Sequence, residues 1–116
     1  MVTRSRKAAN AAFRAIADPT RREILRLLRG GPQTVGGLAG NFRTSRPAIS
    51  KHLRLLRSAG LVTTEIKGAA HICRLNATPL RAVSLWLREY EAWWGESLRS
   101  LKNYVESTAN QKEGDT

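Results

Sequence analysis

The sequence predicts a mainly α-helical domain with one small β-hairpin, in the order α-α-α-α-β-β-α. Apolar residues recur at helical spacing in five stretches of the 116-residue chain. Two runs with strand character, 61–67 and 70–75, flank a short turn with a glycine. A chain of this length is expected to form one domain with a modest core, and its single cysteine cannot form an internal disulfide.

The first two helices are predicted on either side of Asp18. Residues 8–17 are rich in alanine, the best helix former. Asp18 is a good N-cap for the second helix, and Pro19 suits its first position. The sequence Gly30-Gly31-Pro32 ends this helix. We expect the basic residues 1–7 to form a frayed tail.

Residues 34–59 predict a helix-turn-helix. The first helix, 34–42, contains three glycines, each of which costs roughly 0.8–1 kcal/mol relative to alanine, so packing must hold it. The second helix, 45–59, has Ser45 as N-cap, Pro47 in its first turn and Gly60 as its end signal. Two short helices joined by a tight turn place the second helix to read DNA.

The predicted hairpin and final helix complete a winged helix-turn-helix domain over residues 8–106. The hairpin is the wing, at 61–76, and the last helix covers about 79–105. Its apolar stripe is longer than one small domain needs, which predicts a homodimer that assembles through the first and last helices. The predicted interface residues are Phe13, Leu80, Val83, Leu87, Tyr90, Trp94, Leu98 and Leu101.

The alternative for this helix is that Trp86, Trp93 and Trp94 cover the monomer's own core. Residues 107–116 are polar and are expected to form a flexible tail.

The charge of the chain predicts an anionic partner and is unevenly placed. The formal net charge is +11. Fifteen Lys and Arg stand against three Asp and Glu in residues 1–76, and five against six in residues 77–116. The anion-binding surface is therefore expected in the first two-thirds of the chain. Nucleic acid, an anionic membrane and an acidic protein are the partners that such a charge admits.

Several functional classes find no support in the sequence. No apolar run approaches membrane-spanning length, and the N-terminus lacks the apolar region of a signal peptide, so we expect a cytoplasmic protein. No Gly-rich phosphate loop and no Ser/His/Asp set occurs. Asp18 and Glu23 are explained by helix capping and ion pairing. We therefore expect neither an enzyme nor a cofactor.

The second helix of the helix-turn-helix and its surroundings supply the candidate DNA contacts. Its opening residues are expected to meet base edges or phosphates: Ser45, Arg46, Pro47, Ala48, Ser50 and Lys51. Other cations are expected to bind the DNA backbone: Arg43, Arg54, Lys67 and Arg74. His52 is expected to donate to a phosphate, with packing against the wing as the alternative.

A metal site is not predicted. His71 and Cys73 lie two residues apart on one strand face, but two ligands are too few for a site. A redox role for Cys73 would require an exposed thiolate of low pKa, and a half-buried wing residue is the more ordinary interpretation.

With these residues in view, the chain resembles the ArsR/SmtB family of winged-helix repressors. The matching stretches are Ala17–Leu25, Ser45–Leu53, Leu56–Val62 and Arg74–Asn76. The resemblance implies a homodimer that binds double-stranded operator DNA and represses transcription. Cysteine and carboxylate–histidine ligands of the metal-sensing branch are absent, so the chain is more similar to the non-metal branch, which includes small autorepressors of the Sdp type. The resemblance names no inducer.

Two rival functions are compatible with the same composition. A non-specific basic protein that binds DNA or RNA needs the charge, but it needs neither the capped helix nor the dimer stripe. A protein–protein module would use the final helix to bind another chain.

Overall fold

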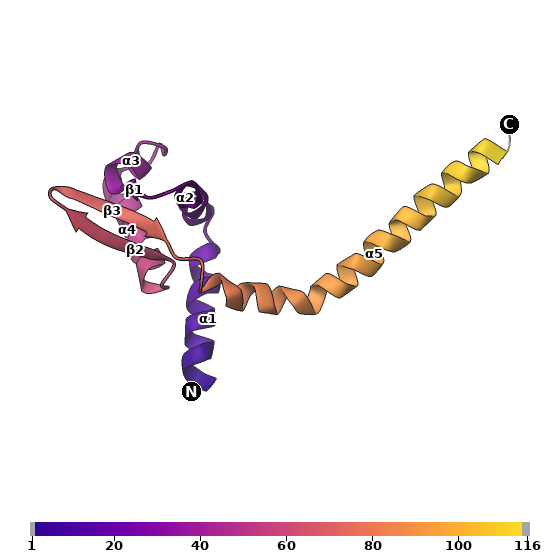
Figure 1. The fold of residues 1–116 in the computed structure, drawn as a ribbon, viewed down its shortest axis with the longest axis horizontal. Coiled ribbons are helices and arrows are strands. Elements are labelled where there is room, and N and C mark those ends of the chain that lie inside the picture. Colours follow the sequence, from indigo (N-terminus) through magenta and orange to yellow (C-terminus); the bar gives the residue numbers. More distant parts are fainter. Residues whose placement is uncertain (1, 115–116) are drawn as a thin grey trace. The chain divides into compact units, whose positions relative to one another are not determined.

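The computed structural model describes the backbone of residues 2–114 and the side chains of residues 6–109. It divides into two compact units, residues 1–83 and 84–116. The elements in order are α1 (Val2–Ile16), α2 (Pro19–Arg29), β1 (Gln33–Thr34), α3 (Val35–Ala39), α4 (Arg46–Ser58), β2 (Val62–Lys67), β3 (Ala70–Leu75) and α5 (Leu80–Gly114) (Figure 1). The predicted mainly helical fold with a β-hairpin is confirmed. Among the described residues, no helix is both long and apolar enough to span a bilayer.

The connection between α1 and α2 is held by hydrogen bonds among its own residues. Asp18 is the N-cap of α2, and its Oδ2 accepts from the backbone N–H of Arg21 at 3.0 Å. The Arg21 side chain turns back and donates to the carbonyls of Ala15 (2.7 Å) and Arg14 (3.0 Å). The Arg21 side chain therefore serves two of the terminal carbonyls of α1 and ties that end to α2, and Arg22 Nη1 donates to a third, that of Ile16, at 2.8 Å.

Removing the Asp18 cap is expected to lower the free energy of unfolding by about 1 kcal/mol. The hydrogen bond from the Arg21 backbone N–H, foremost among several causes, lowers the pKa of Asp18 below its ordinary value. The carboxylate therefore contributes stability above its unfolded pKa, and this contribution is lost as the pH falls through the lower folded pKa. Urea unfolding of Asp18→Ala against the wild type, at pH 7 and near pH 3, measures both effects.

Asp18→Asn is the control for this prediction, because asparagine keeps a capping oxygen but does not titrate in this range. It should stay close to the wild type at pH 7 and lose less stability on acidification. Equal acid sensitivity of the wild type and Asp18→Asn would contradict the assignment.

The core of the first unit is built around α4. Ile24 and Leu28 of α2, Leu38 of α3, and Leu61 and Val62 at the start of the hairpin are buried together with the apolar face of α4. That face consists of Ile49, Leu53 and Leu56. The glycine-rich α3 spans five residues, fewer than predicted, and is capped by Thr34, whose Oγ1 accepts from the Gly37 N–H at 3.0 Å.

The sheet has three antiparallel strands in the order β1-β3-β2. The predicted hairpin is present, with Val62 paired to Leu75 and Lys67 to Ala70. Gly68, at φ +61°, opens the two-residue turn, a conformation that favours glycine. Strand β1, which pairs Gln33 with Cys73, was not predicted from the sequence.

The two ends of the chain differ from the prediction. Residues 2–7, the expected frayed tail, form the first turns of α1, and no Gly or Pro interrupts this stretch. Helix α5 extends to Gly114 and so includes most of the stretch 107–116 that was expected to form a flexible tail. An i,i+4 pair of Lys102 with Glu106 at 3.9 Å stabilises the turn of α5 that precedes this stretch. Residues 115 and 116 lie outside the described residues.

Candidate nucleic-acid interface

Helix α4 begins and ends at the positions that the sequence predicted. The Ser45 Oγ accepts from the Ala48 N–H at 3.3 Å, and Pro47 lies in the first turn. At the other end Gly60 adopts φ +76°. The backbone N–H groups of Gly60 and Leu61 donate to the carbonyls of Arg57 and Leu56, both at 2.9 Å, which closes a Schellman motif. Both ends of the helix are therefore fixed by the local sequence.

The helix has three distinct sides, which follow from its 100° turn per residue. Opposite the buried face, Pro47, Lys51 and Arg54 are exposed to solvent. The flank that carries Arg46 and Ser50, together with Arg57, faces a hollow lined also by the hairpin. The predicted DNA contacts on α4 are thus divided between an outward row and a hairpin-facing flank.

The predicted DNA-binding residues all lie outside the buried core. Eight are exposed: Arg43, Ser45, Arg46, Pro47, Lys51, Arg54, Lys67 and Arg74. Ala48, Ser50 and His52 are half-buried.

Two wing cations share one carboxylate. The Glu65 side chain lies 3.5 Å from Arg74 Nη2 and 4.0 Å from Lys67 Nζ. This pairing reduces the positive charge that the wing offers to DNA. Sequence reasoning did not find it, because the pair depends on the register of β2 against β3.

His52 faces α2. Its Nδ1 lies 3.3 Å from Arg21 Nη1 and 3.9 Å from Asp18 Oδ2. Packing of His52 against the wing is therefore wrong, because the side of α4 that carries it is turned to the start of α2. A phosphate contact by His52 remains a prediction.

Cys73 is a core residue on the central strand. Its side chain is 1% exposed, and its partner in the sheet is Thr64. Burial raises the pKa of the Cys73 thiol, and the hydrogen bond with Thr64 and the charge of Arg57 oppose that shift. A buried thiol of raised pKa disfavours the redox switch. No group of three or more candidate metal ligands occurs in the described part of the chain.

The acidic residues Asp18 and Glu23, which were considered for acid–base chemistry, have structural partners. Asp18 caps α2 as described, and Glu23 binds Arg26 with an Nη2–Oε1 distance of 2.6 Å. The hydrogen bond from Arg26 lowers the pKa of the Glu23 carboxyl. Capping and ion pairing therefore account for both carboxylates.

Helix α5 presents an apolar stripe. Within it, Trp86, Tyr90 and Trp94 form a row of rings with centroid separations of 5.0 and 6.4 Å. Exposed apolar residues continue along this side of the helix: Trp93, Leu98, Leu101, Tyr104 and Val105. Of the other predicted interface residues, Phe13, Leu80, Val83 and Leu87 are half-buried.

Comparison with known proteins gives one consistent result. The family model described as "Bacterial regulatory protein, arsR family" matches residues 18–64. The transcriptional repressor SdpR of Bacillus subtilis is 42% identical over 81 residues, which are 70% of this chain and 90% of the relative. The HTH-type transcriptional regulator Rv2034 of Mycobacterium tuberculosis is 34% identical over 101 residues, 87% of this chain and 92% of the relative.

A solved structure agrees with the sequence relatives. The crystal structure of an ArsR family transcriptional regulator, RHA00566, superposes with a TM-score of 0.69 at 37% identity and covers 77% of this chain and 92% of its own.

Proposed function

From the premise that this chain belongs to the ArsR family of transcriptional regulators and is a DNA-binding repressor, we propose that it acts as a homodimer on a two-fold operator. In this proposal α4 of each protomer enters the major groove, and α1 and α5 join the protomers. Repression of its own gene is part of the proposal. A repressor of this kind works where the chromosome lies, so the cytoplasm is its expected location.

The observation that carries the DNA-binding mode is the outward row of α4. Pro47, Lys51 and Arg54 lie opposite the buried face, on a helix capped at both ends. In the described part of the chain neither Lys51 nor Arg54 pairs with a carboxylate. A preformed helix with unpaired cations on its free side suits the major groove and the phosphates beside it.

The apolar stripe of α5 supports the dimer. The row Trp86–Tyr90–Trp94 and the leucines after it are exposed on a helix whose sequence has no excess charge. Aromatic residues of this kind are the usual anchors of protein–protein interfaces. A second copy of the same helix would cover the stripe in an isologous contact.

The two kinds of DNA contact are expected to separate in mutants. Arg54→Ala should weaken binding to operator and random duplexes alike and lower the salt slope by about 1 for each phosphate that is no longer neutralised. Ser50→Ala and Arg46→Ala should cost operator binding roughly 1–3 kcal/mol and affect random DNA less, if these residues meet base edges. Fluorescence anisotropy on both duplexes at several salt concentrations measures this, with an operator obtained by selecting bound genomic fragments.

Arg29→Ala is the control for the loss of a positive charge as such, since it removes one exposed charge from α2 and leaves α4 intact. Footprinting of the wild type should protect two half-sites about 34 Å apart, one helical turn. If all three α4 variants lose affinity equally on both duplexes, the helix is only a cationic surface, and the non-specific function replaces the proposed one.

Metal ions are expected to leave DNA binding unchanged. Thiolate and imidazole ligands would have to come from Cys73, which is buried, and from His71 and His52, which lie on different elements, β3 and α4. Adding one equivalent of zinc, cadmium or arsenite to the operator complex should not alter the anisotropy. Release of DNA at that level, abolished by Cys73→Ser, would contradict the proposal.

A further inference from the structure

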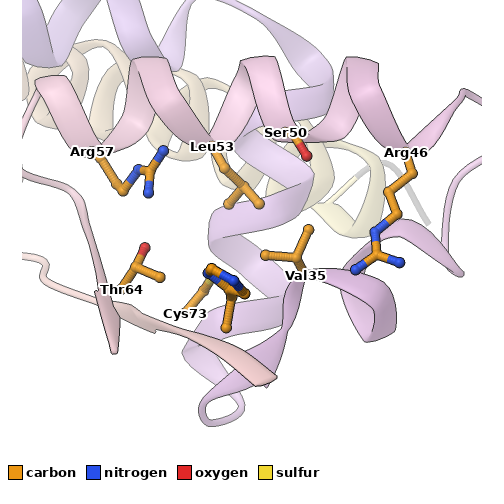
Figure 2. Close-up of a pocket in the computed structure, with 8 residues that line it drawn as sticks. Val35, Arg46, Ser50, Leu53, Arg57, Thr64 and Cys73 are labelled. Carbon is orange, nitrogen blue, oxygen red and sulfur yellow. The ribbon is translucent and has the colours of Figure 1, made fainter. Parts of the chain in front are cut away.

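A hollow of about 340 Å³ lies between α4, the hairpin and the start of α3. Figure 2 shows Arg46, Ser50, Leu53 and Arg57 of α4 directed toward it. The hollow lies entirely within the first unit of the chain. Its volume is at the lower end of the range of small-molecule sites, roughly 300–1,000 Å³.

The base of the hollow is apolar. Val35 of α3, Leu53 of α4 and Cys73 of β3 line it (Figure 2). Leu53 and Cys73 belong to the core, with 3% and 1% of their surface exposed. Packing therefore holds Leu53 and Cys73 rigidly, and together with the half-buried Val35 they form a preformed apolar base.

The rim of the hollow is positively charged. Arg46 and Arg57 stand eleven residues apart on the same side of α4 and border the hollow. Neither guanidinium pairs with a carboxylate among the described residues. Glu65, the acidic residue of β2, is occupied by Arg74 and Lys67 and does not line the hollow.

Other polar side chains complete the lining of the hollow. Ser50 and Thr64 provide hydroxyl groups, and His71 provides an imidazole. Arg57 lies close enough to Cys73 for its charge to act on the thiol, and Thr64 hydrogen-bonds that thiol. Guanidinium and hydroxyl groups together are the donors that bind carboxylate and phosphate oxygens.

We infer that this hollow binds a small organic anion, with an apolar body on Val35, Leu53 and Cys73 and a carboxylate or phosphate group at Arg57. Arg46 borders the other end of the hollow, about three helical turns away. Because Arg46 and Ser50, which are proposed DNA contacts, line the same hollow, an anion bound in it would oppose the approach of DNA phosphates. The ligand is therefore expected to weaken operator binding, and DNA to weaken ligand binding by the same factor. This second half of the inference rests on the proposed function, whereas the site itself does not.

The site is tested first without DNA. Benzoate and phenyl phosphate are the probes, added up to about 20 mM to the isotope-labelled full chain while its amide resonances are followed by NMR. We expect saturable shifts at Val35, Leu53 and Cys73. Arg57→Gln should weaken the binding roughly ten- to a hundredfold, the effect of losing a charged hydrogen bond. Arg54→Gln removes the same charge from the outward side of α4 and should leave probe binding unchanged.

Two results of this titration would overturn the site. One is the absence of saturable shifts, or equal shifts in the wild type and Arg57→Gln. The other is that inorganic phosphate binds as tightly as phenyl phosphate. In that case the apolar base contributes nothing to the affinity, and the occupant of the hollow is a DNA phosphate.

The regulatory half is tested on the operator complex. Phenyl phosphate should lower the operator affinity of the wild type severalfold at saturation, and it should have a smaller effect on Arg57→Gln. If the NMR shifts are present but the operator affinity does not change, the regulatory half is wrong and the site stands. If Arg57→Gln weakens binding to operator and random DNA equally and the probe has no effect on either, the DNA backbone is the occupant, and the inferred effector is wrong.

Discussion

The double variant Leu87→Glu, Trp94→Glu is expected to be monomeric and to lose at least about a hundredfold in operator affinity. A homodimer places each substitution at the interface twice, and carboxylates without partners are costly to bury. A monomer engages one half-site at a time and loses the gain from linked binding, which is typically 10²–10⁴-fold. Light scattering at micromolar concentration measures the mass, and anisotropy measures the affinity.

Leu85→Glu is the matched control for this variant. Leu85 is exposed on the same helix, but the turn of the helix places it away from the Trp86–Tyr90–Trp94 row. This variant should remain a dimer with near wild-type affinity. Circular dichroism of both variants separates loss of assembly from loss of folding. A wild-type chain that is monomeric at micromolar concentration would contradict the proposed dimer directly.

Features encoded by neighbouring residues could be predicted from the sequence. Asp18 before Pro19 fixed the start of α2, and Ser45, Pro47 and Gly60 fixed both ends of α4. These signals act within one helical turn, so the sequence displays them without knowledge of the fold. The hairpin was equally accessible, because its strands flank a two-residue turn that opens on a glycine.

Features that depend on distant residues could not be predicted. Strand β1 has two residues, and its partner Cys73 lies forty positions away from Gln33 in the chain. The contact of His52 with Asp18 and Arg21 depends on how α4 packs against α2. Helix ends without a cap are also weakly encoded in the sequence. The end of α5 was therefore predicted at about residue 105, whereas the helix continues to Gly114.

The candidate site likewise has features that neighbouring residues encode and features that depend on distant ones. Sequence reasoning identified the cations of α4 as a group, but it did not separate the outward row from the flank that faces the hairpin. That separation needs the position of the buried face, which Ile49, Leu53 and Leu56 define. It also needs the hairpin strands, which bring Thr64 and Cys73 opposite Arg57. The hollow is therefore a property of the fold alone.

Ile49→Ala is expected to destabilise the domain by about 2–5 kcal/mol, because the deleted atoms leave a cavity in a packed core. The Ile49 side chain is completely buried, at 0% exposed. A loss of this size is a large part of the roughly 5–15 kcal/mol that stabilises a typical domain. It should lower the melting temperature by about 10 °C or more. Operator binding should fall as well, since the same residue anchors the helix that carries Lys51 and Arg54.

Leu55→Ala separates the effect of burial from the effect of deleting an apolar side chain from α4. Leu55 lies on the same helix but is 44% exposed, so its loss should cost less than about 1 kcal/mol. Both variants are compared by urea unfolding at one fixed protein concentration, because a dimer gains stability with concentration. Equal destabilisation by the two substitutions would show that Ile49 is not held in the core as described, and the assignment of the outward side of α4 would fail with it.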